Sequence, residues 1–430
     1  MNTARPRLVP AVAAGGLALA TAATALISGS PATAGVPSHN EQVALVDGTG
    51  AQLEFKSKIN GTAQVTSYDG RYVVFSTDAP LVASDDNGID DVYRRDTVND
   101  VTLLVSAAGG QPGNDYSVEP TISDTGRFVA FTTWATDLTQ DRNGSTLDVV
   151  VKDLRTDRIR LVSVTSKEKQ VRQNSFSPVI SGNGRHVSFQ TFGKFGRKDG
   201  DKLEDVYVRD VRRGVTRQAS LHPTGNDIRE SVLNGDISDN GRIVVFGNDN
   251  RLWARNVVQG TTVRFWQEPD APPCQPFPAG SAGRPVVSGD GRFVAFASCA
   301  TDLPGENGQA TDVYRMRLSN GAVQRVTKKG NGNSYLPSLS RNGRYVGFGS
   351  DATNFVAGDT SGPDAFVADV RTGAVTRASQ TPGGSEGNNW SAANAVAISG
   401  DGRSLAYQSY ASDLVPGDTV DLEEVFVWRR

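Results

Sequence analysis

Short runs of alternating apolar and polar residues, separated by turns rich in Asp, Asn, Gly and Ser, recur along most of the chain. One of them, SYDGRYVVF at residues 67–75, returns six times in related form. The copies are SDTGRFVAF from Ser123, SGNGRHVSF from Ser181, SDNGRIVVF from Ser238, SGDGRFVAF from Ser288, SRNGRYVGF from Ser340 and SGDGRSLAY from Ser399. Their shared glycines lie 50 to 59 residues apart, at Gly70, Gly126, Gly184, Gly241, Gly291, Gly343 and Gly402. This even spacing indicates one structural unit repeated seven times.

Each unit contains four strand-like segments. In the second unit they are residues 120–123, 127–133, 148–153 and 159–164. Asp-Gly or Asn-Gly before an alternating run predicts a tight hairpin, because glycine accepts the positive φ that the turn needs. Four antiparallel strands repeated seven times, with no helical segment, predict an all-β fold, the seven-bladed β-propeller. A β-solenoid is the competing repeat fold, but its rungs are much shorter than these units.

The two ends of the chain predict how the ring closes. The seventh unit stops at Arg430, directly after its third strand. Residues 42–47 resemble the fourth strand of other units, such as residues 101–106. We therefore expect residues 42–47 to complete blade seven, which leaves no unpaired strand edge in the ring. Residues 35–430 would then form a single propeller domain.

The repeat also resembles a known family. The unit S-x-[DN]-G-R-x-[VL]-x-F, followed by a strand such as Asp91-Val92-Tyr93, is similar to the PD40 or WD40-like repeat of TolB-like propellers. The resemblance spans residues 42–430 and implies a propeller fold, whereas it says little about function. The turn is spelled Ser-x-Asp/Asn-Gly in place of Ser-Pro-Asp-Gly, and we expect no counterpart of the small α/β domain that precedes the TolB propeller.

Residues 1–34 differ from the rest of the chain. Arg5 and Arg7 precede an apolar, alanine-rich run at 8–27, and Ala32-Thr33-Ala34 offers a small-x-small cleavage motif. This pattern predicts a secretory signal peptide, and an uncleaved membrane anchor is the alternative. We expect a secreted or cell-envelope-associated protein, with no stable membrane insertion after cleavage.

Charge and cysteine content narrow the choice of partners. The chain has 44 basic and 47 acidic side chains, and loss of Arg5 and Arg7 with the leader makes it more acidic. This balance argues against strong nucleic-acid binding. Cys274 and Cys299 are the only cysteines in the sequence, and an oxidising compartment favours a disulfide between them, two buried thiols being the alternative. We expect a monomer.

An arginine follows every shared glycine. The seven are Arg71, Arg127, Arg185, Arg242, Arg292, Arg344 and Arg403. Seven arginines on one rim could form an anion-binding ring. However, several third strands end in an acidic residue, namely Asp96, Asp153, Asp210 and Asp369, and Arg–carboxylate pairs would use the guanidinium structurally. We therefore interpret the shared glycines and arginines as structural.

No catalytic constellation stands out. Gly383–Gly387 spells G-x-S-x-G, but it lies in a polar loop and not on a strand-to-helix turn. The three histidines, His39, His186 and His222, lack metal-ligand spacing with one another. Acidic loops at 85–91, 141–144, 358–362 and 418–424 offer the oxygen ligands that Ca²⁺ prefers. Asx turns explain the same residues more simply, so we expect no cofactor and keep calcium as the alternative.

Four aromatic residues are candidates for ligand binding. Tyr116, Trp266, Tyr335 and Trp390 fall in predicted blade-to-blade loops, where they could stack on a sugar or anchor a protein, or else pack between blades. The leading hypothesis is a non-catalytic binding or scaffold propeller that recognises an extracellular protein or glycan. The alternative is a polysaccharide lyase or glycosidase that uses carboxylates near the central channel. Two carboxylates beside an exposed aromatic residue in one cleft would favour the enzyme.

Overall fold

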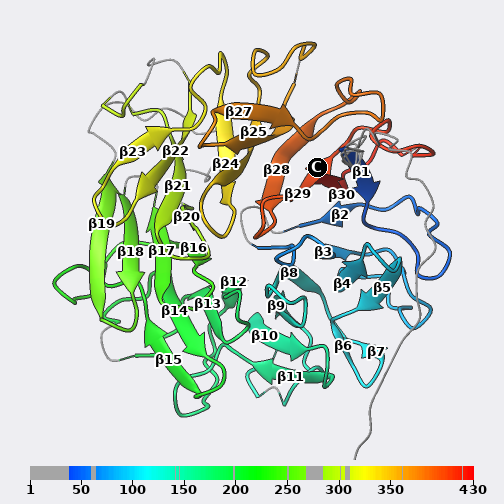
Figure 1. Ribbon diagram of the computed structural model, residues 1–430. Helices are drawn as coiled ribbons and strands as arrows, with labels where there is room; N and C mark the ends of the chain where they lie inside the picture. Colours follow the sequence, from blue (N-terminus) through cyan, green and yellow to red (C-terminus); the bar gives the residue numbers. More distant parts are fainter. Residues whose placement is uncertain are drawn as a thin grey trace, which may run out of the picture. The chain divides into compact units, whose positions relative to one another are not determined.

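The computed structural model describes residues 38–59, 64–140, 142–144, 146–196, 199–248, 251–267, 284–300, 302–305, 310–360, 362–418 and 420–430. All regular secondary structure in these residues is β-strand. Residues 38–430 form one compact unit. Within it, seven four-stranded antiparallel sheets follow one another in chain order around a ring (Figure 1). The predicted seven-bladed β-propeller is confirmed.

The strands of each blade are consecutive in the chain, except in blade 7. Blade 1 contains β2 (Ser57–Lys58), β3 (Tyr72–Thr77), β4 (Asp91–Asp96) and β5 (Val101–Leu104), and blade 2 contains β8 (Ser117–Ile122), β9 (Phe128–Thr133), β10 (Asp148–Asp153) and β11 (Arg158–Leu161). Blade 3 contains β12 (Ser175–Ile180), β13 (His186–Thr191), β14 (Asp205–Asp210) and β15 (Val215–Gln218), and blade 4 contains β16 (Leu233–Ile237), β17 (Ile243–Asn248), β18 (Arg251–Asn256) and β19 (Thr261–Gln267). Blade 5 contains β20 (Val286–Val287), β21 (Phe293–Ser298), β22 (Asp312–Arg317) and β23 (Val323–Arg325), and blade 6 contains β24 (Ser334–Leu339), β25 (Tyr345–Ser350), β26 (Asp364–Asp369) and β27 (Ala374–Arg377). Blade 7 contains β28 (Ser391–Ile398), β29 (Ser404–Ser409), β30 (Glu424–Arg429) and β1 (His39–Gln42), while β6 (Ala107–Ala108) and β7 (Gln111–Pro112) form a short hairpin between blades 1 and 2.

Aromatic pairs across the second and third strands hold six of the blades together. The pairs are Phe75–Tyr93, Phe189–Tyr207, Phe246–Trp253, Phe296–Tyr314, Phe348–Phe366 and Tyr407–Phe426, each with roughly parallel rings. All twelve side chains are buried. Such pairs contribute about 0.5–1.5 kcal/mol each beyond the burial of their area. The alternating pattern of the sequence therefore places one buried pair of stacked aromatic rings in each of these blades.

The shared glycine turn joins the first two strands of a blade and also meets the preceding blade. Gly126 has a φ of +70°, and a Cβ on it would lie 2.1 Å from the Tyr72 ring of blade 1. Any larger residue would therefore strain the turn and push the two blades apart. The other six shared glycines also have positive φ, which confirms the predicted tight turn.

Blade 7 is closed by the N-terminal strand, but the strand differs from the predicted range. β1 comprises His39–Gln42 and pairs antiparallel with β30, whereas residues 42–47 were expected (Figure 1). The amide of Val43 donates to the Val425 carbonyl at 3.0 Å, as Val105 does to Val92 in blade 1. The apolar residues from Val43 onward therefore correspond to the buried segment that follows a fourth strand, and not to the strand itself. The apolar pattern alone placed the strand about three residues too late.

Two predictions fall outside the described residues. The signal peptide at 1–34 lies in the undescribed segment 1–37. Cys274 also lies outside the described residues, so its disulfide with Cys299, which directly follows β21, stays a prediction. In the part of the chain that the structure describes, we find no helix with the length and apolar character needed to cross a membrane.

Candidate functional site

Four of the seven repeated arginines form the expected pairs. Arg71, Arg127, Arg185 and Arg344 each donate two hydrogen bonds of 2.6–3.0 Å, to Asp96, Asp153, Asp210 and Asp369 respectively. Hydrogen bonds from the arginine lower the pKa of Asp96, Asp153 and Asp369 to about 2. These guanidinium groups hold the second and third strands together, so they are not available as an anion-binding ring.

Only two of the four candidate aromatic residues are exposed. Tyr116 and Trp390 are 47% and 57% exposed and directly precede the first strands of blades 2 and 7. Trp266 instead lies on β19 and stacks on Phe296, with ring centroids 5.6 Å apart. Tyr335 lies on β24 and is fully buried. Packing within and between blades thus explains Trp266 and Tyr335.

The carboxylates beside the central channel have structural partners. Burial raises the pKa of Asp236 to about 7, and its side chain accepts hydrogen bonds from the Ile237 and Val287 amides at 2.7 and 3.0 Å. Asp239 pairs with Arg341 at 2.8 Å. The cavity beside them has a volume of about 40 Å³ and no aromatic lining residue. This cavity is far smaller than the one of about 1010 Å³ between blades 2 and 3, and it offers little room for a sugar chain.

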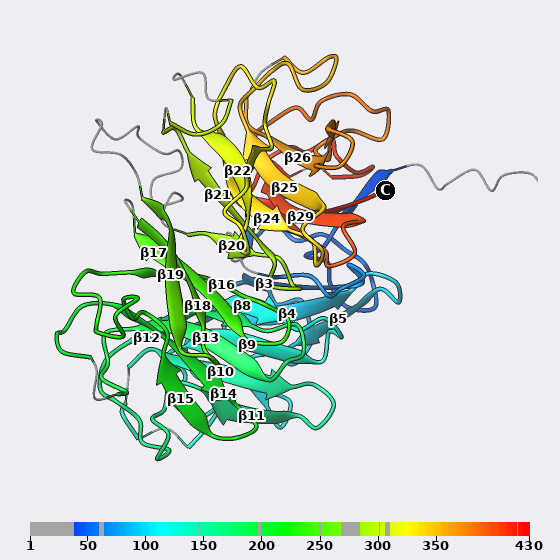
Figure 2. The same cartoon turned by 60° about the vertical axis from the view of Figure 1, so that its left-hand side comes forward.

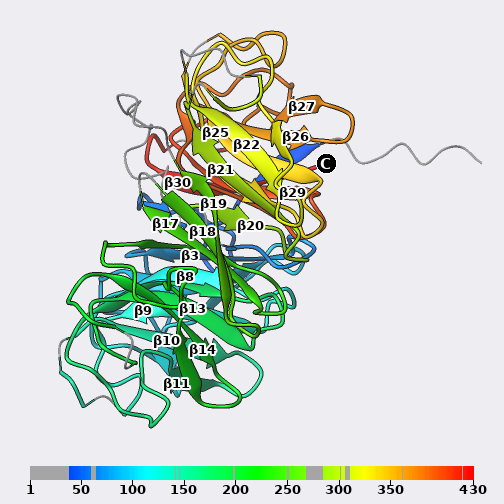
Figure 3. The ribbon, with the colours of Figure 1, turned by 90° about the vertical axis from the view of Figure 1, so that its left-hand side faces the viewer.

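A basic groove of about 1010 Å³ lies between blades 2 and 3. One side is formed by β11 and the loops near it, and the other by β14 and the turn that leads to β15. Figures 2 and 3 show blades 2 and 3, to which these strands belong, in the same part of the ring. Among the described residues, the lining contains seven cationic side chains and a single carboxylate, that of Glu168. The cations are Arg142, Arg160, Lys169, Arg172, Arg209, Arg212 and Arg213. The groove is strongly positive although the chain as a whole is acidic.

Most of this positive charge is not neutralised by carboxylates of the described residues. Arg209 is buried and pairs with Glu168, and Arg213 lies 4.0 Å from Asp210. No carboxylate of the described residues lies within ion-pair distance of the other five cations. The sequence analysis missed this groove because the cations come from separate loops and strands of two blades. Only a local excess of Arg and Lys between residues 155 and 217 hinted at it.

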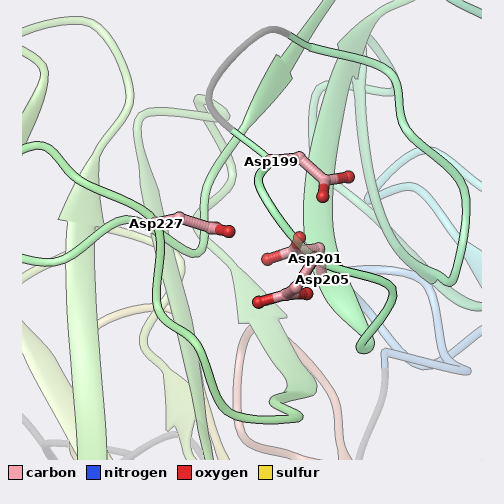
Figure 4. A group of neighbouring side chains, drawn as sticks. All are labelled: Asp199, Asp201, Asp205 and Asp227. Atoms are coloured by element: carbon pink, nitrogen blue, oxygen red, sulfur yellow. The ribbon is translucent and has the colours of Figure 1, made fainter.

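Blade 3 also carries an acidic cluster, shown in Figure 4. Asp199 and Asp201 lie in the loop between β13 and β14, Asp205 begins β14, and Asp227 lies in the linker to blade 4. One oxygen from each carboxylate lies within 4.8 Å of the others, and the side chain of Asp227 points toward the other three. We call these four residues the blade-3 cluster. Burial raises the pKa of Asp205 to about 7.

Blade 6 has a matching cluster with an added cation. Asp359, Asp364 and Glu386 occupy the corresponding loop, strand start and linker, and their oxygens also lie within 4.8 Å of one another. Nη1 of Arg377 lies 3.8 Å from each of the three carboxylates. Arg377, at the end of β27, lies opposite Phe366 of the third strand. Gln218 occupies the equivalent position in blade 3, where it lies opposite Tyr207. The calcium hypothesis named the loop of blade 6 but not that of blade 3.

Sequence comparisons do not assign the chain to a family. No protein-family model matches it, and no curated protein is similar enough to match. Solved structures do match over most of the chain. An oligogalacturonate lyase from Vibrio parahaemolyticus aligns at 10% identity and a TM-score of 0.56, covering 92% of this chain and 97% of that one.

Two further structures agree with this result. An oligogalacturonate lyase in complex with manganese aligns at 11% identity and a TM-score of 0.55, covering 92% of this chain and 96% of that one. The β-propeller domain of the trilobed protease from Pyrococcus furiosus aligns at 12% identity and a TM-score of 0.52, covering 87% and 96%. The likeness is one of fold. It supports the expected propeller architecture and leaves the function to be argued from the residues.

Proposed function

We propose that the chain is an exported, non-catalytic binding propeller that holds an acidic polysaccharide in the basic groove. The observation that carries this proposal is the excess of cations in the groove, seven against one carboxylate, in a cavity of about 1010 Å³. A hollow of this size accommodates several sugar units. Guanidinium groups bind carboxylates in a bidentate manner, so arginines suit a polymer that bears a carboxylate on each unit.

Three further points favour an acidic glycan over a nucleic acid. No lining residue of the groove is aromatic, whereas proteins that bind single-stranded nucleic acids stack the bases on aromatic side chains. The predicted signal peptide would also place the chain outside the cell. In addition, two of the solved structures with this fold are oligogalacturonate lyases, which are named for a polymer of carboxylated sugars.

A lyase is the second candidate, because of those two structures. The channel offers it little support, since the Asp236 and Asp239 carboxylates have structural partners beside a cavity of about 40 Å³. An exposed aromatic residue beside two carboxylates in one cleft, the arrangement expected of the enzyme, is missing from that cavity. Binding without cleavage is therefore the function that the geometry supports best.

The test is a titration of the mature protein with polygalacturonate, followed by calorimetry at low and at moderate salt. We expect binding that weakens with salt, and we expect the double variant Arg160→Glu/Arg172→Glu to bind at least about tenfold more weakly, since both side chains are exposed and lie in the groove. The matched control is Lys328→Glu/Lys329→Glu, two exposed cations outside the groove.

Three outcomes would contradict the proposal. Equal binding by the groove variant and the parent protein would remove the groove from the function. Release of unsaturated sugars during the titration would establish a lyase. Binding to DNA or RNA, with none to acidic glycans, would assign the groove to a different class of polyanion.

A further inference from the structure

We propose that the blade-3 cluster binds one divalent cation, Ca²⁺, between blades 3 and 4. The site would be formed by Asp199, Asp201, Asp205 and Asp227, whose carboxylate oxygens converge within 4.8 Å (Figure 4). This inference does not depend on the basic groove. It rests on how few partners these four carboxylates have within the protein.

The strongest observation is a buried carboxylate oxygen that no hydrogen-bond donor of the described residues reaches. Asp205 is 2% exposed, and its Oδ1 accepts a hydrogen bond from the Ser220 hydroxyl at 2.5 Å. Its Oδ2 is buried and accepts no hydrogen bond from the described residues. Oδ1 of Asp199 and Oδ2 of Asp201 are likewise buried without a donor. Leaving such groups uncompensated costs free energy, so a cation at the shared centre of these three oxygens would be stabilising.

The remaining oxygens of the cluster are held in place by the protein. Oδ2 of Asp199 accepts from the Tyr207 hydroxyl at 3.2 Å. Asp227 accepts from the Gly200 amide at 2.9 Å and from Gln218 Nε2 at 2.7 Å. These donors orient both carboxylates toward the shared centre. A preorganised set of oxygens loses less freedom when an ion binds.

The basic side chain that approaches the cluster within the described residues is Lys194. Its Nζ lies 3.9 Å from Oδ1 of Asp199, and half of this side chain is exposed to solvent. A single solvated ammonium group at this distance offsets only part of the charge of four carboxylates. Among the described residues, negative charge therefore remains at the centre of the cluster.

The oxygen chemistry favours Ca²⁺ among the common divalent ions. Carboxylates are hard ligands, and Ca²⁺ binds them at about 2.3–2.6 Å, so opposite ligands lie roughly 5 Å apart. The four oxygens lie within 4.8 Å of one another, close enough to share one such ion. Mg²⁺ requires about 2.0–2.1 Å in a strict octahedron, and soft or imidazole-preferring metals find neither Cys nor His in the cluster. A bound Ca²⁺ would link the loop between β13 and β14 to the linker that leads to blade 4, because both would supply ligands.

The other blades supply an internal control. In blade 6, Arg377 lies among the equivalent carboxylates, and in blade 5, Nη2 of Arg325 lies 2.7 Å from Oδ2 of Asp312. Blade 3 has the neutral Gln218 at this position. The fold thus tolerates an arginine here. Gln218→Arg should place a guanidinium in the cluster, and it should exclude the ion without disturbing the strands.

The experiment is a calorimetric titration of the chelator-treated mature protein with CaCl₂, and separately with MnCl₂ and MgCl₂. We expect one Ca²⁺ per chain in the parent protein and no binding in Gln218→Arg. We also expect Asp205→Asn to bind at least about tenfold more weakly, because affinity follows the number of charged ligands. Asp421→Asn, which removes an exposed acidic residue outside the cluster, should bind as the parent does.

Circular dichroism spectra without metal establish that each variant is folded before the titration. The proposal is overturned if the parent protein takes up no Ca²⁺, or if both Gln218→Arg and Asp205→Asn bind it as the parent does. Tighter binding of Mg²⁺ or Mn²⁺ than of Ca²⁺ would overturn the choice of ion. None of these outcomes bears on polygalacturonate binding, so the two proposals can fail separately.

Discussion

Blades 3 and 6 build the same acidic pocket and balance its charge differently. In both, a carboxylate at the start of the third strand faces acidic residues from the adjoining loop and linker. Burial raises the pKa of Asp205 and of Asp364 to about 7, so the charged form is costly in both blades. Blade 3 has four carboxylates and blade 6 has three, and the side chain at the end of the fourth strand is the neutral Gln218 in blade 3 and the cationic Arg377 in blade 6.

In blade 7, the carboxylate at the start of the third strand is stabilised in a third way. Glu424 begins its third strand and accepts hydrogen bonds from the amide groups of Gln42 and Gln52, at 2.7 and 3.1 Å. Neutral donors therefore stabilise this carboxylate without an opposite charge. The repeat fixes where a carboxylate lies, while one or two neighbouring residues decide whether it pairs with arginine, with amides or with an ion.

The largest effect is expected when the arginine of blade 6 is removed. Arg377→Gln would leave Asp359, Asp364 and Glu386 without their cation in a buried site. Breaking a buried ion pair on one side costs about 3 kcal/mol or more, so the free energy of unfolding without metal should fall by that amount. Urea denaturation in the presence of a chelator measures it.

The same variant also tests the equivalence of the two blades. With Ca²⁺ present, Arg377→Gln should recover part of its lost stability and bind two ions per chain in place of one. Arg377→Lys, which keeps a positive charge, serves as the control and should bind one. If Arg377→Gln has the same free energy of unfolding as the parent protein, the charge of Arg377 does not stabilise blade 6.

A smaller effect is expected when blade 3 is given the arginine of blade 6. At a Ca²⁺ concentration of about 100 times the dissociation constant, the parent should gain ~2.7 kcal/mol, and Gln218→Arg should gain nothing. Thermal unfolding with calcium and with chelator measures this difference. A calcium-dependent melting temperature in Gln218→Arg equal to that of the parent would place the ion elsewhere.

The smallest effect concerns the opposite end of β26, where Asp369 pairs with Arg344. The pKa of Asp369 is lowered to about 2, below the ordinary value of about 3.9. The pair therefore stabilises the fold above about pH 4, and this contribution is lost as the pH falls toward 2. Arg344→Gln should lower the urea midpoint at pH 7 and converge with the parent in acid. A constant difference at all pH values would refute the pairing as its cause.

Much of the fold follows from the sequence, because local chemistry determines it. The turn around Gly126 needs positive φ, and β10 at Asp148–Asp153 matches the expected third strand. The closing strand was less predictable, since the apolar run from Val43 fits a strand as well as it fits a strand exit. Here the register is decided by hydrogen bonds to β30, nearly 390 residues away in the chain.

The candidate sites were harder to predict, because they depend on residues that converge only in the folded ring. Asp227 meets Asp199 and Asp205 from a linker that follows two strands later, and no short motif records this. A clue was present in the Asp-Gly-Asp at residues 199–201, four residues before Asp205. The exposed aromatic residue Trp390 was found from loop chemistry, whereas Tyr335 was not distinguishable from it until its burial was known.

Closure of blade 7 by β1 has a consequence for the order of folding. His39 pairs with Arg429, so the last sheet can be completed only after the chain has been made as far as β30. Bringing together ends so far apart has a large entropic cost, and contacts of this kind form slowly. Blades 1 to 6 consist of consecutive strands and need no such meeting of ends. We therefore expect ring closure to be the late step, during which an open three-stranded blade 7 is the part of the protein most exposed to misassembly.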